Sequence, residues 1–88
     1  MVVTFVQNGH VIEVNRQLTK LSLIVDDNLC DVLNGPINAQ LRSGHLRSEI
    51  KNHDGSTSAV EVVLKMTGLA DDLILYLDGK PVETKKIL

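Results

Sequence analysis

Aromatic side chains are nearly absent from this 88-residue sequence, which contains no tryptophan, one phenylalanine and one tyrosine. Phe5 and Tyr76 are too few to stack the bases of an exposed nucleic-acid strand. An excess of positive charge is also lacking, since nine Lys and Arg residues stand against eleven Asp and Glu residues. The chain therefore has no basic surplus with which to bind a phosphate backbone or an anionic bilayer. Neither nucleic acid nor membrane is expected as a partner.

The sequence has a single cysteine, Cys30, which excludes an intramolecular disulfide. Small secreted domains usually rely on such bonds, so a reducing, cytoplasmic compartment is expected. Residues 1–6 lack a charged segment followed by a long apolar one, so they do not predict a signal peptide. No apolar run approaches the ~18 residues of a membrane-spanning helix. The length suits one core, and we expect a single β-rich domain over residues 1–88.

An Asn-Gly pair at residues 8–9 lies between two alternating aliphatic segments, Val2–Gln7 and His10–Val14. Asn-Gly favours a type I′ turn, because both residues tolerate positive φ. A two-residue turn pairs Val6 with Val11. The face opposite to these two residues is the predicted core and contains Val3, Phe5, Ile12 and Val14. Val6 and Val11 themselves are expected to face water or a partner.

A second hairpin is predicted around the Asp-Gly pair at residues 78–79, which follows a run of five apolar residues. A two-residue turn places Tyr76 opposite Pro81 and Leu75 opposite Val82. Because proline has no N–H to donate, its strand is expected at a sheet edge or at a bulge.

A third hairpin is predicted at His53–Gly55, which ends in another Asp-Gly pair. A two-residue loop places Ser48 opposite Glu61 and so mixes core with charge. A three-residue loop instead pairs Ser48 with Val60 and Arg47 with Glu61, which keeps the apolar residues on one face. We therefore predict the three-residue loop.

Alternating apolar and polar residues predict a further strand over Leu18–Val25. The polar segments Asn15–Gln17 and Thr67–Asp72 are expected to connect strands. Residues 21–26 also resemble residues 73–78, since both alternate aliphatic side chains and end in aspartate. Any two strands with alternating apolar residues, each followed by a turn that begins with aspartate, show such a similarity, so no duplication is inferred.

The segment after this strand has two interpretations. As a turn at Asp26–Asn28, with Asn28 left-handed, it leads into a strand over Leu29–Leu33. As a helix over residues 27–34, it is capped by Asp27 and stopped by a Gly-Pro pair. We favour the strand. The predicted fold is then all-β, an antiparallel meander of six to eight short strands closing into a small barrel or a sandwich. The alternative is α+β with the short helix.

Candidate catalytic and metal-binding residues are few. The soft ligands lack the spacing of a zinc site; they are His10, Cys30, His45 and His53. The neighbouring carboxylate of Asp31 disfavours a thiolate, so Cys30 is predicted to be a small buried or half-buried thiol. The acidic residues of 26–31 lack the glycine and closing glutamate of an EF-hand and are expected to form turns. We expect no cofactor, no metal and no catalytic residue.

Three functions are compatible with these features of the sequence. The favoured one is a non-catalytic protein-interaction domain, with a homodimer as one form, in which an exposed sheet face or edge docks a partner. The candidate surface contains two kinds of residue, apolar side chains that are expected to face away from the core and two arginines of the positively charged segment 42–53. These residues are Val6, Val11, Ile74, Tyr76, Arg42 and Arg47. The second is a carrier of a small apolar ligand that uses a barrel mouth or the space between sheets. The third and least favoured is an enzyme.

Overall fold

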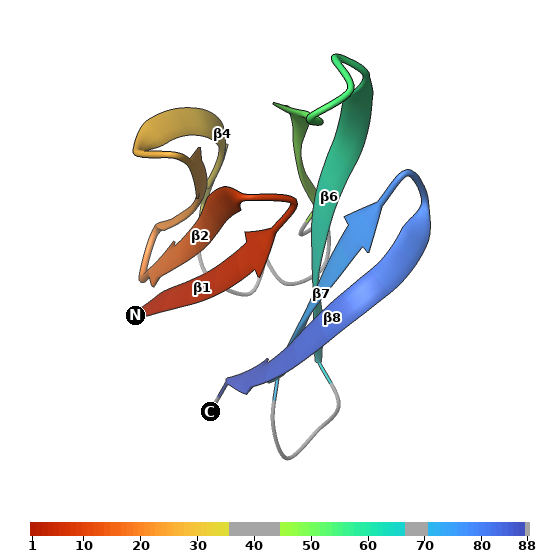
Figure 1. Cartoon of the computed structure of the whole chain (residues 1–88). Helices are drawn as coiled ribbons and strands as arrows, with labels where there is room; N and C mark the ends of the chain where they lie inside the picture. Colours follow the sequence, from red (N-terminus) through yellow and green to blue (C-terminus); the bar gives the residue numbers. More distant parts are fainter. Residues whose placement is uncertain (36–44, 67–70, 88) are drawn as a thin grey trace.

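The structure is a computed structural model, and it describes residues 1–35, 45–66 and 71–87. These residues form eight strands in two four-stranded antiparallel sheets, which pack together as a sandwich (Figure 1). Sheet A consists, in spatial order, of β1 (Val2–Gln7), β2 (His10–Gln17), β3 (Lys20–Val25) and β4 (Asn28–Asn34). Sheet B consists of β5 (His45–Lys51), β6 (Thr57–Met66), β7 (Asp71–Leu77) and β8 (Lys80–Ile87). The all-β prediction is confirmed. The described residues contain no helix of the length and apolarity that a membrane crossing requires.

The core lies between the two sheets and is almost entirely aliphatic. Strand periodicity produces it, since Ile12 and Val14 on β2 are fully buried while the intervening Val11 is partly exposed. The core side chains are each at most 7 % exposed: Phe5, Ile12, Val14, Leu21, Leu23 and Val25 from sheet A, and Leu46, Ile50, Val60, Val62, Leu64, Leu73, Leu75 and Ile87 from sheet B.

Side chains, rather than a backbone ladder, join the edges of the two sheets. Asp31 on β4 accepts a hydrogen bond from the backbone N–H of Arg47 on β5, at 2.8 Å. At the other edge, the Lys85 ammonium on β8 donates to the carbonyl of Thr4 on β1 and lies 5.3 Å from the centre of the Phe5 ring. In the described part of the chain, hydrogen-bonded strand pairs stay within each sheet. The fold is therefore a sandwich and not a closed barrel.

The predicted hairpin at residues 8–9 is confirmed. Its two turn residues have φ angles of 52° at Asn8 and 79° at Gly9. Val6 pairs with Val11, as a two-residue turn requires. The three-residue loop over His53–Gly55 is confirmed too, and it brings together the expected pairs, Ser48 with Val60 and Arg47 with Glu61. Burial of the aliphatic residues on one face thus selected the register.

Replacing Gly55 by alanine is expected to lower the free energy of unfolding by about 1 kcal/mol, because left-handed backbone crowds an L side chain. Gly55 has a φ of 88°, and no atom lies within 4 Å of the position that a Cβ would take. The loss should therefore come from the backbone alone, and Gly55→Asn should cost less, since asparagine tolerates this region. Urea unfolding of both variants checks the prediction. It is contradicted if Gly55→Ala and Gly55→Asn lower the free energy of unfolding equally.

The register of the last hairpin corrects the sequence prediction. Tyr76 does lie opposite Pro81, but Leu75 pairs with Glu83 and not with Val82. Val82 is the extra residue of a β-bulge, which leaves its side chain exposed. The strand that contains Pro81 was predicted to lie at a sheet edge or at a bulge. Both alternatives are confirmed, because β8 is an edge strand and carries a bulge.

Residues 28–34 form strand β4, so the alternative helix over residues 27–34 is wrong. The left-handed residues are Asp26 and Asp27, with φ angles of 49° and 67°, and not Asn28, which begins the strand. A long-range contact fixes this turn. The Asp26 carboxylate accepts the N–H of Val11, and the Asp26 N–H donates to the Val11 carbonyl, both at 2.9 Å. A helix cap at Asp27 would lack these contacts with β2.

Two predicted connections are strands instead. Residues Asn15–Gln17 belong to β2, which turns into β3 at Leu18 and Thr19. Asp71 and Asp72 begin β7; residues 67–70 lie outside the described residues. Both errors have one cause. Arg16 and Asp71, which interrupt the apolar patterns, form an ion pair across the two sheets at 2.7 Å and are mostly buried.

The two sheets are structural repeats of each other. Each is a four-stranded meander, and the turn before its last strand begins with a left-handed aspartate, Asp26 or Asp78. Asp78 contacts Ala59 on β6 as Asp26 contacts Val11 on β2, through its carboxylate and through its N–H, each at 2.9 Å. This shared contact aligns the strands of sheet A with those of sheet B.

The alignment extends to an irregular feature. Cys30 is the extra residue of a bulge between β3 and β4, at the position that Val82 occupies between β7 and β8. The similar segments 21–26 and 73–78 are the third strand of each sheet with its turn aspartate. The sequence similarity therefore marks equivalent strands, which alternation alone could not establish.

Candidate functional site

The outer face of sheet A exposes several large aliphatic side chains among polar ones. Val6 and Val11 form a cross-strand pair at 64 % and 39 % exposure, and Leu29 on β4 is 63 % exposed. Ile24 on β3 is half-buried and stands between Glu13 on β2 and Leu29 on β4. We call this surface the outer face of sheet A. Its described residues are Val2, Thr4, Val6, Val11, Glu13, Asn15, Gln17, Lys20, Ser22, Ile24, Leu29, Val32 and Asn34.

The equivalent face of sheet B is mainly polar. The register places Glu49 and Ala59 in sheet B where Val6 and Val11 stand in sheet A. Arg47 likewise takes the place of Thr4. The other aliphatic residues of this face are replaced by His45 for Val2, Tyr76 for Ile24, Pro81 for Leu29 and Thr84 for Val32. In the opposite sense, sheet B has Val63 for Asn15 and Ile74 for Ser22, and both of these side chains are half-buried. The first two strands of sheet B thus form the same architecture without a large exposed aliphatic pair, so the fold alone does not require Val6 and Val11 at these positions.

The structure separates the predicted surface residues. Val6 and Val11 lie on the outer face of sheet A, whereas Ile74, Tyr76 and Arg47 lie on the outer face of sheet B. The sixth residue, Arg42, falls outside the described residues. They therefore do not form one continuous surface. Leu29, which the sequence did not single out, adds to Val6 and Val11 on sheet A.

Arg47 is bound within sheet B by an ion pair. Its guanidinium lies 3.0 Å from the carboxylate of Glu61, and the imidazole of His45 lies 3.3 Å from the other carboxylate oxygen. The Arg47–Glu61 pair confirms the cross-strand contact predicted from the register. The pairing leaves Arg47 partly neutralised, so it does not add a free positive charge to a docking surface.

Two shallow hollows open on the surface. The larger, of about 490 Å³, is lined by Arg47, Ser48, Glu49, Ala59, Val60, Glu61 and Gly79. The smaller, of about 390 Å³, is lined by Asn8, Asn52, His53 and Asp54. A carrier of an apolar ligand needs an enclosed apolar space. Both hollows are open to solvent and not enclosed, and the space between the sheets is filled by the core side chains.

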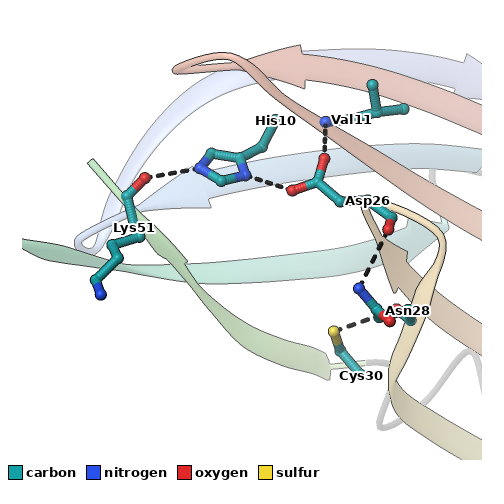
Figure 2. A network of polar contacts seen from close by, with 6 residues as sticks. All are labelled: His10, Val11, Asp26, Asn28, Cys30 and Lys51. Carbon is teal, nitrogen blue, oxygen red and sulfur yellow. Dashed lines mark hydrogen bonds and ion pairs between the residues drawn. The ribbon is translucent and has the colours of Figure 1, made fainter. Parts of the chain in front are cut away.

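A polar cluster joins the two sheets at one end of the sandwich (Figure 2). His10, the first residue of β2, directs its Nδ1 to the carboxylate of Asp26 at 2.5 Å. Its Nε2 reaches the backbone carbonyl of Lys51, at the end of β5, at 2.7 Å. The other Asp26 oxygen accepts the Val11 N–H. One imidazole thereby links the β3–β4 turn of sheet A with a strand of sheet B.

The partners of His10 determine its protonation. A carboxylate and a carbonyl oxygen only accept hydrogen bonds, so each ring nitrogen must donate one, which describes an imidazolium. The Asp26 hydrogen bond, assisted by the Lys51 carbonyl, raises the pKa of His10 above its ordinary value of 6.5. The His10 hydrogen bond, with that of Val11 N–H, lowers the pKa of Asp26 below 3.8. In this state His10 has no free lone pair with which to act as a base or bind a metal.

The other candidate ligands do not assemble. Within the described ranges, no three His, Cys, Asp or Glu residues are grouped as a metal site would require. Cys30 is exposed, which corrects the prediction of a buried or half-buried thiol. It is exposed because it is the bulge residue of β4, and its thiol donates to the carbonyl of Asn28 at 3.3 Å. The sequence predicts only an exposed residue beside a turn for His10. No local signal marks its partners, which lie 16 and 41 residues away.

Comparison of the chain with protein-family models, with curated proteins and with solved structures finds no match. The outer face of sheet A and the His10 cluster are therefore interpreted from their own chemistry. The first exposes aliphatic side chains to solvent, and the second links the two sheets.

Proposed function

We propose that this protein is a non-catalytic interaction domain that self-associates through the outer face of sheet A. The observation that carries the proposal is the difference between the two repeats. Where sheet B has a charged or small residue, sheet A exposes valine, and Leu29 projects from β4 beside them. Contiguous apolar side chains rimmed by polar ones are typical of protein contact sites, because their burial removes apolar area from water.

A second copy of the chain is the partner that the charges favour. Of the described residues on this face, Glu13 is the only acid and Lys20 the only base, so the face itself is close to neutral. Two copies can approach face to face without like-charge repulsion, although each chain has a formal net charge of −2. A two-fold contact uses the same patch on both subunits, which suits a self-complementary apolar surface.

Val6→Lys and Leu29→Lys are each expected to weaken self-association at least tenfold, because each buries an unpaired ammonium at the contact. Sedimentation velocity over a range of concentrations measures this effect. The wild-type mass should rise from 9.7 kDa toward twice that value, whereas the variants should stay monomeric to higher concentration.

The matched control is Thr84→Lys, which adds the same charge at an exposed position on the outer face of sheet B. It should associate like the wild type. A Thr84→Lys variant that loses association as fully as Val6→Lys would show that net charge, and not sheet A, governs the effect. Monomeric wild type throughout the range would contradict the proposal outright.

A further inference from the structure

The polar end of the sandwich contains a second link beside His10. The side-chain amide of Asn8, in the β1–β2 turn, donates to the side-chain oxygen of Asn52, just after β5, at 3.1 Å. His53 in the following loop also lies against this turn, since a Cβ on Gly9 would be 3.8 Å from its Nε2. His10 and Asn8 therefore tie the same two segments of the chain, one from each sheet.

We propose that His10 is a proton-controlled latch, which in its protonated form holds this end of sheet A against β5 and on deprotonation releases it. The geometry carries the proposal. One ring bridges two acceptors from different sheets, and each contact requires its own N–H. The sheets have no backbone ladder between them at this end within the described residues, so the link is not duplicated by strand pairing.

Removal of the proton breaks one particular contact. A neutral imidazole retains a single N–H and can satisfy only one of the two acceptors. The carboxylate of Asp26 is the stronger acceptor because it is charged, so the N–H stays with Asp26. The lone pair of Nε2 then faces the lone pairs of the Lys51 carbonyl oxygen, and this contact turns from attractive to repulsive. The bond that is lost is the one between the sheets.

The groups around His10 support this order of events. The β3–β4 turn contributes the carboxylate of Asp26, which favours the imidazolium. From β5, Lys51 offers its carbonyl, while its ammonium is directed away from the ring (Figure 2). The β5–β6 loop contributes His53 and Asp54, which line the hollow beside Asn8. Because His53 is a second imidazole beside the same turn, its signals must be distinguished from those of His10.

The sign of the pH effect follows from the two pKa shifts. His10 has a raised pKa in the folded protein, so its stabilising contribution is complete below 6.5 and is lost as the pH rises through that raised value. Asp26 has a lowered pKa, so its contribution is complete above 3.8 and is lost as the pH falls through the lowered value. The latch is closed between these limits and opens on the alkaline side through His10.

Nuclear magnetic resonance titration of the full-length wild type tests the latch. The His10 ring signals should titrate with a midpoint above 6.5, and the side-chain amide signals of Asn8 and Asn52 should move with the same midpoint. His53→Asn should leave both midpoints in place. A His10 midpoint at or below 6.5 overturns the proposal. Side-chain amide signals of Asn8 and Asn52 that do not change at the His10 midpoint also overturn the proposal, because protonation of His10 would then affect sheet A alone.

The repeat supplies matched variants. Ser58 occupies the position of His10 in sheet B, so His10→Ser gives sheet A the residue of its counterpart. The urea midpoint of the wild type is expected to fall as the pH rises through the raised pKa of His10, and His10→Ser should lose this fall. Asp26→Asn should lower the His10 midpoint toward its ordinary value, because it removes the larger of the two hydrogen-bond effects that raise the pKa. Asp78→Asn, at the equivalent turn without a histidine, should leave the pH dependence unchanged. If the urea midpoint of His10→Ser depends on pH as that of the wild type does, the proposal is overturned. If His10→Ser does not fold, the titration of the wild type alone decides.

Discussion

Leu75→Ala is expected to lower the free energy of unfolding by about 2 to 5 kcal/mol, the range for leucine removed from a packed core. Leu75 is completely buried on β7, a central strand of sheet B, and pairs with Val62 on β6. Its side chain faces the core residues of sheet A, so truncation leaves a cavity between the sheets. Urea unfolding followed by circular dichroism measures the change, with an unaltered denaturant slope expected if two-state unfolding is preserved.

Leu18→Ala is the matched control, because it removes the same atoms from the β2–β3 turn, where Leu18 is 78 % exposed. Its effect should stay within about 0.5 kcal/mol, as is usual for exposed positions. Similar losses in the two variants would mean that the face-to-face packing of the sheets does not determine stability.

Asp71→Ala is expected to destabilise the fold by roughly 3 kcal/mol, the lower part of the range for removing one partner of a buried ion pair. Asp71 and Arg16 are 19 % and 14 % exposed and lie 2.7 Å apart, on β7 and β2. Without the carboxylate, the guanidinium stays between the sheets with no opposite charge. The Arg16 Nε is already buried without a hydrogen-bond partner, which increases the cost of losing Asp71.

The double variant Arg16→Leu with Asp71→Leu tests the cause of that loss. Leu64 stands at the position of Arg16 in the other repeat, so an apolar residue is compatible with this place in the fold. The double variant should be at least about 1 kcal/mol more stable than the sum of the single effects predicts. Additive effects would show that the two side chains act independently and that the ion pair does not couple the sheets.

The hairpins could be predicted from the sequence because their determinants are local. Asn8-Gly9 and Asp78-Gly79 supply the positive φ angles of tight turns, and all four residues adopt them. The three-residue loop at 53–55 followed from register, since only that pairing keeps the aliphatic residues on one face. The bulge at Val82 was missed because one unpaired residue leaves the turn chemistry unchanged.

The segments that were misassigned depend on contacts between distant residues. Arg16 interrupts the apolar pattern of β2, and its partner Asp71 lies 55 residues further along the chain. Asp26 and Asp27 suit a helix cap as well as a left-handed turn, and the contact of Asp26 with Val11 decides between them. Such contacts exist only once the sheets have formed.

The candidate surface could be predicted in part. Alternation shows which residues of a hairpin share a face, and it correctly placed Val6 and Val11 opposite the core. It does not show which hairpins join the same sheet, so Ile74 and Tyr76 were grouped with them although they belong to sheet B. Leu29 was overlooked because it lies in the segment whose structure was ambiguous.

The most direct test of self-association through sheet A is a dilution series of the wild-type chain followed by ¹⁵N–¹H correlation spectra. The proposal predicts that backbone amide signals of Val6, Val11 and Leu29 shift with concentration. The amide signals of the counterparts on sheet B, Glu49 and Ala59, should stay constant. The counterpart of Leu29 is Pro81, which has no N–H, so the amide signal of the preceding Lys80 is followed instead and should also stay constant. Shifts confined to sheet B, or spectra that do not change with concentration, would contradict the account.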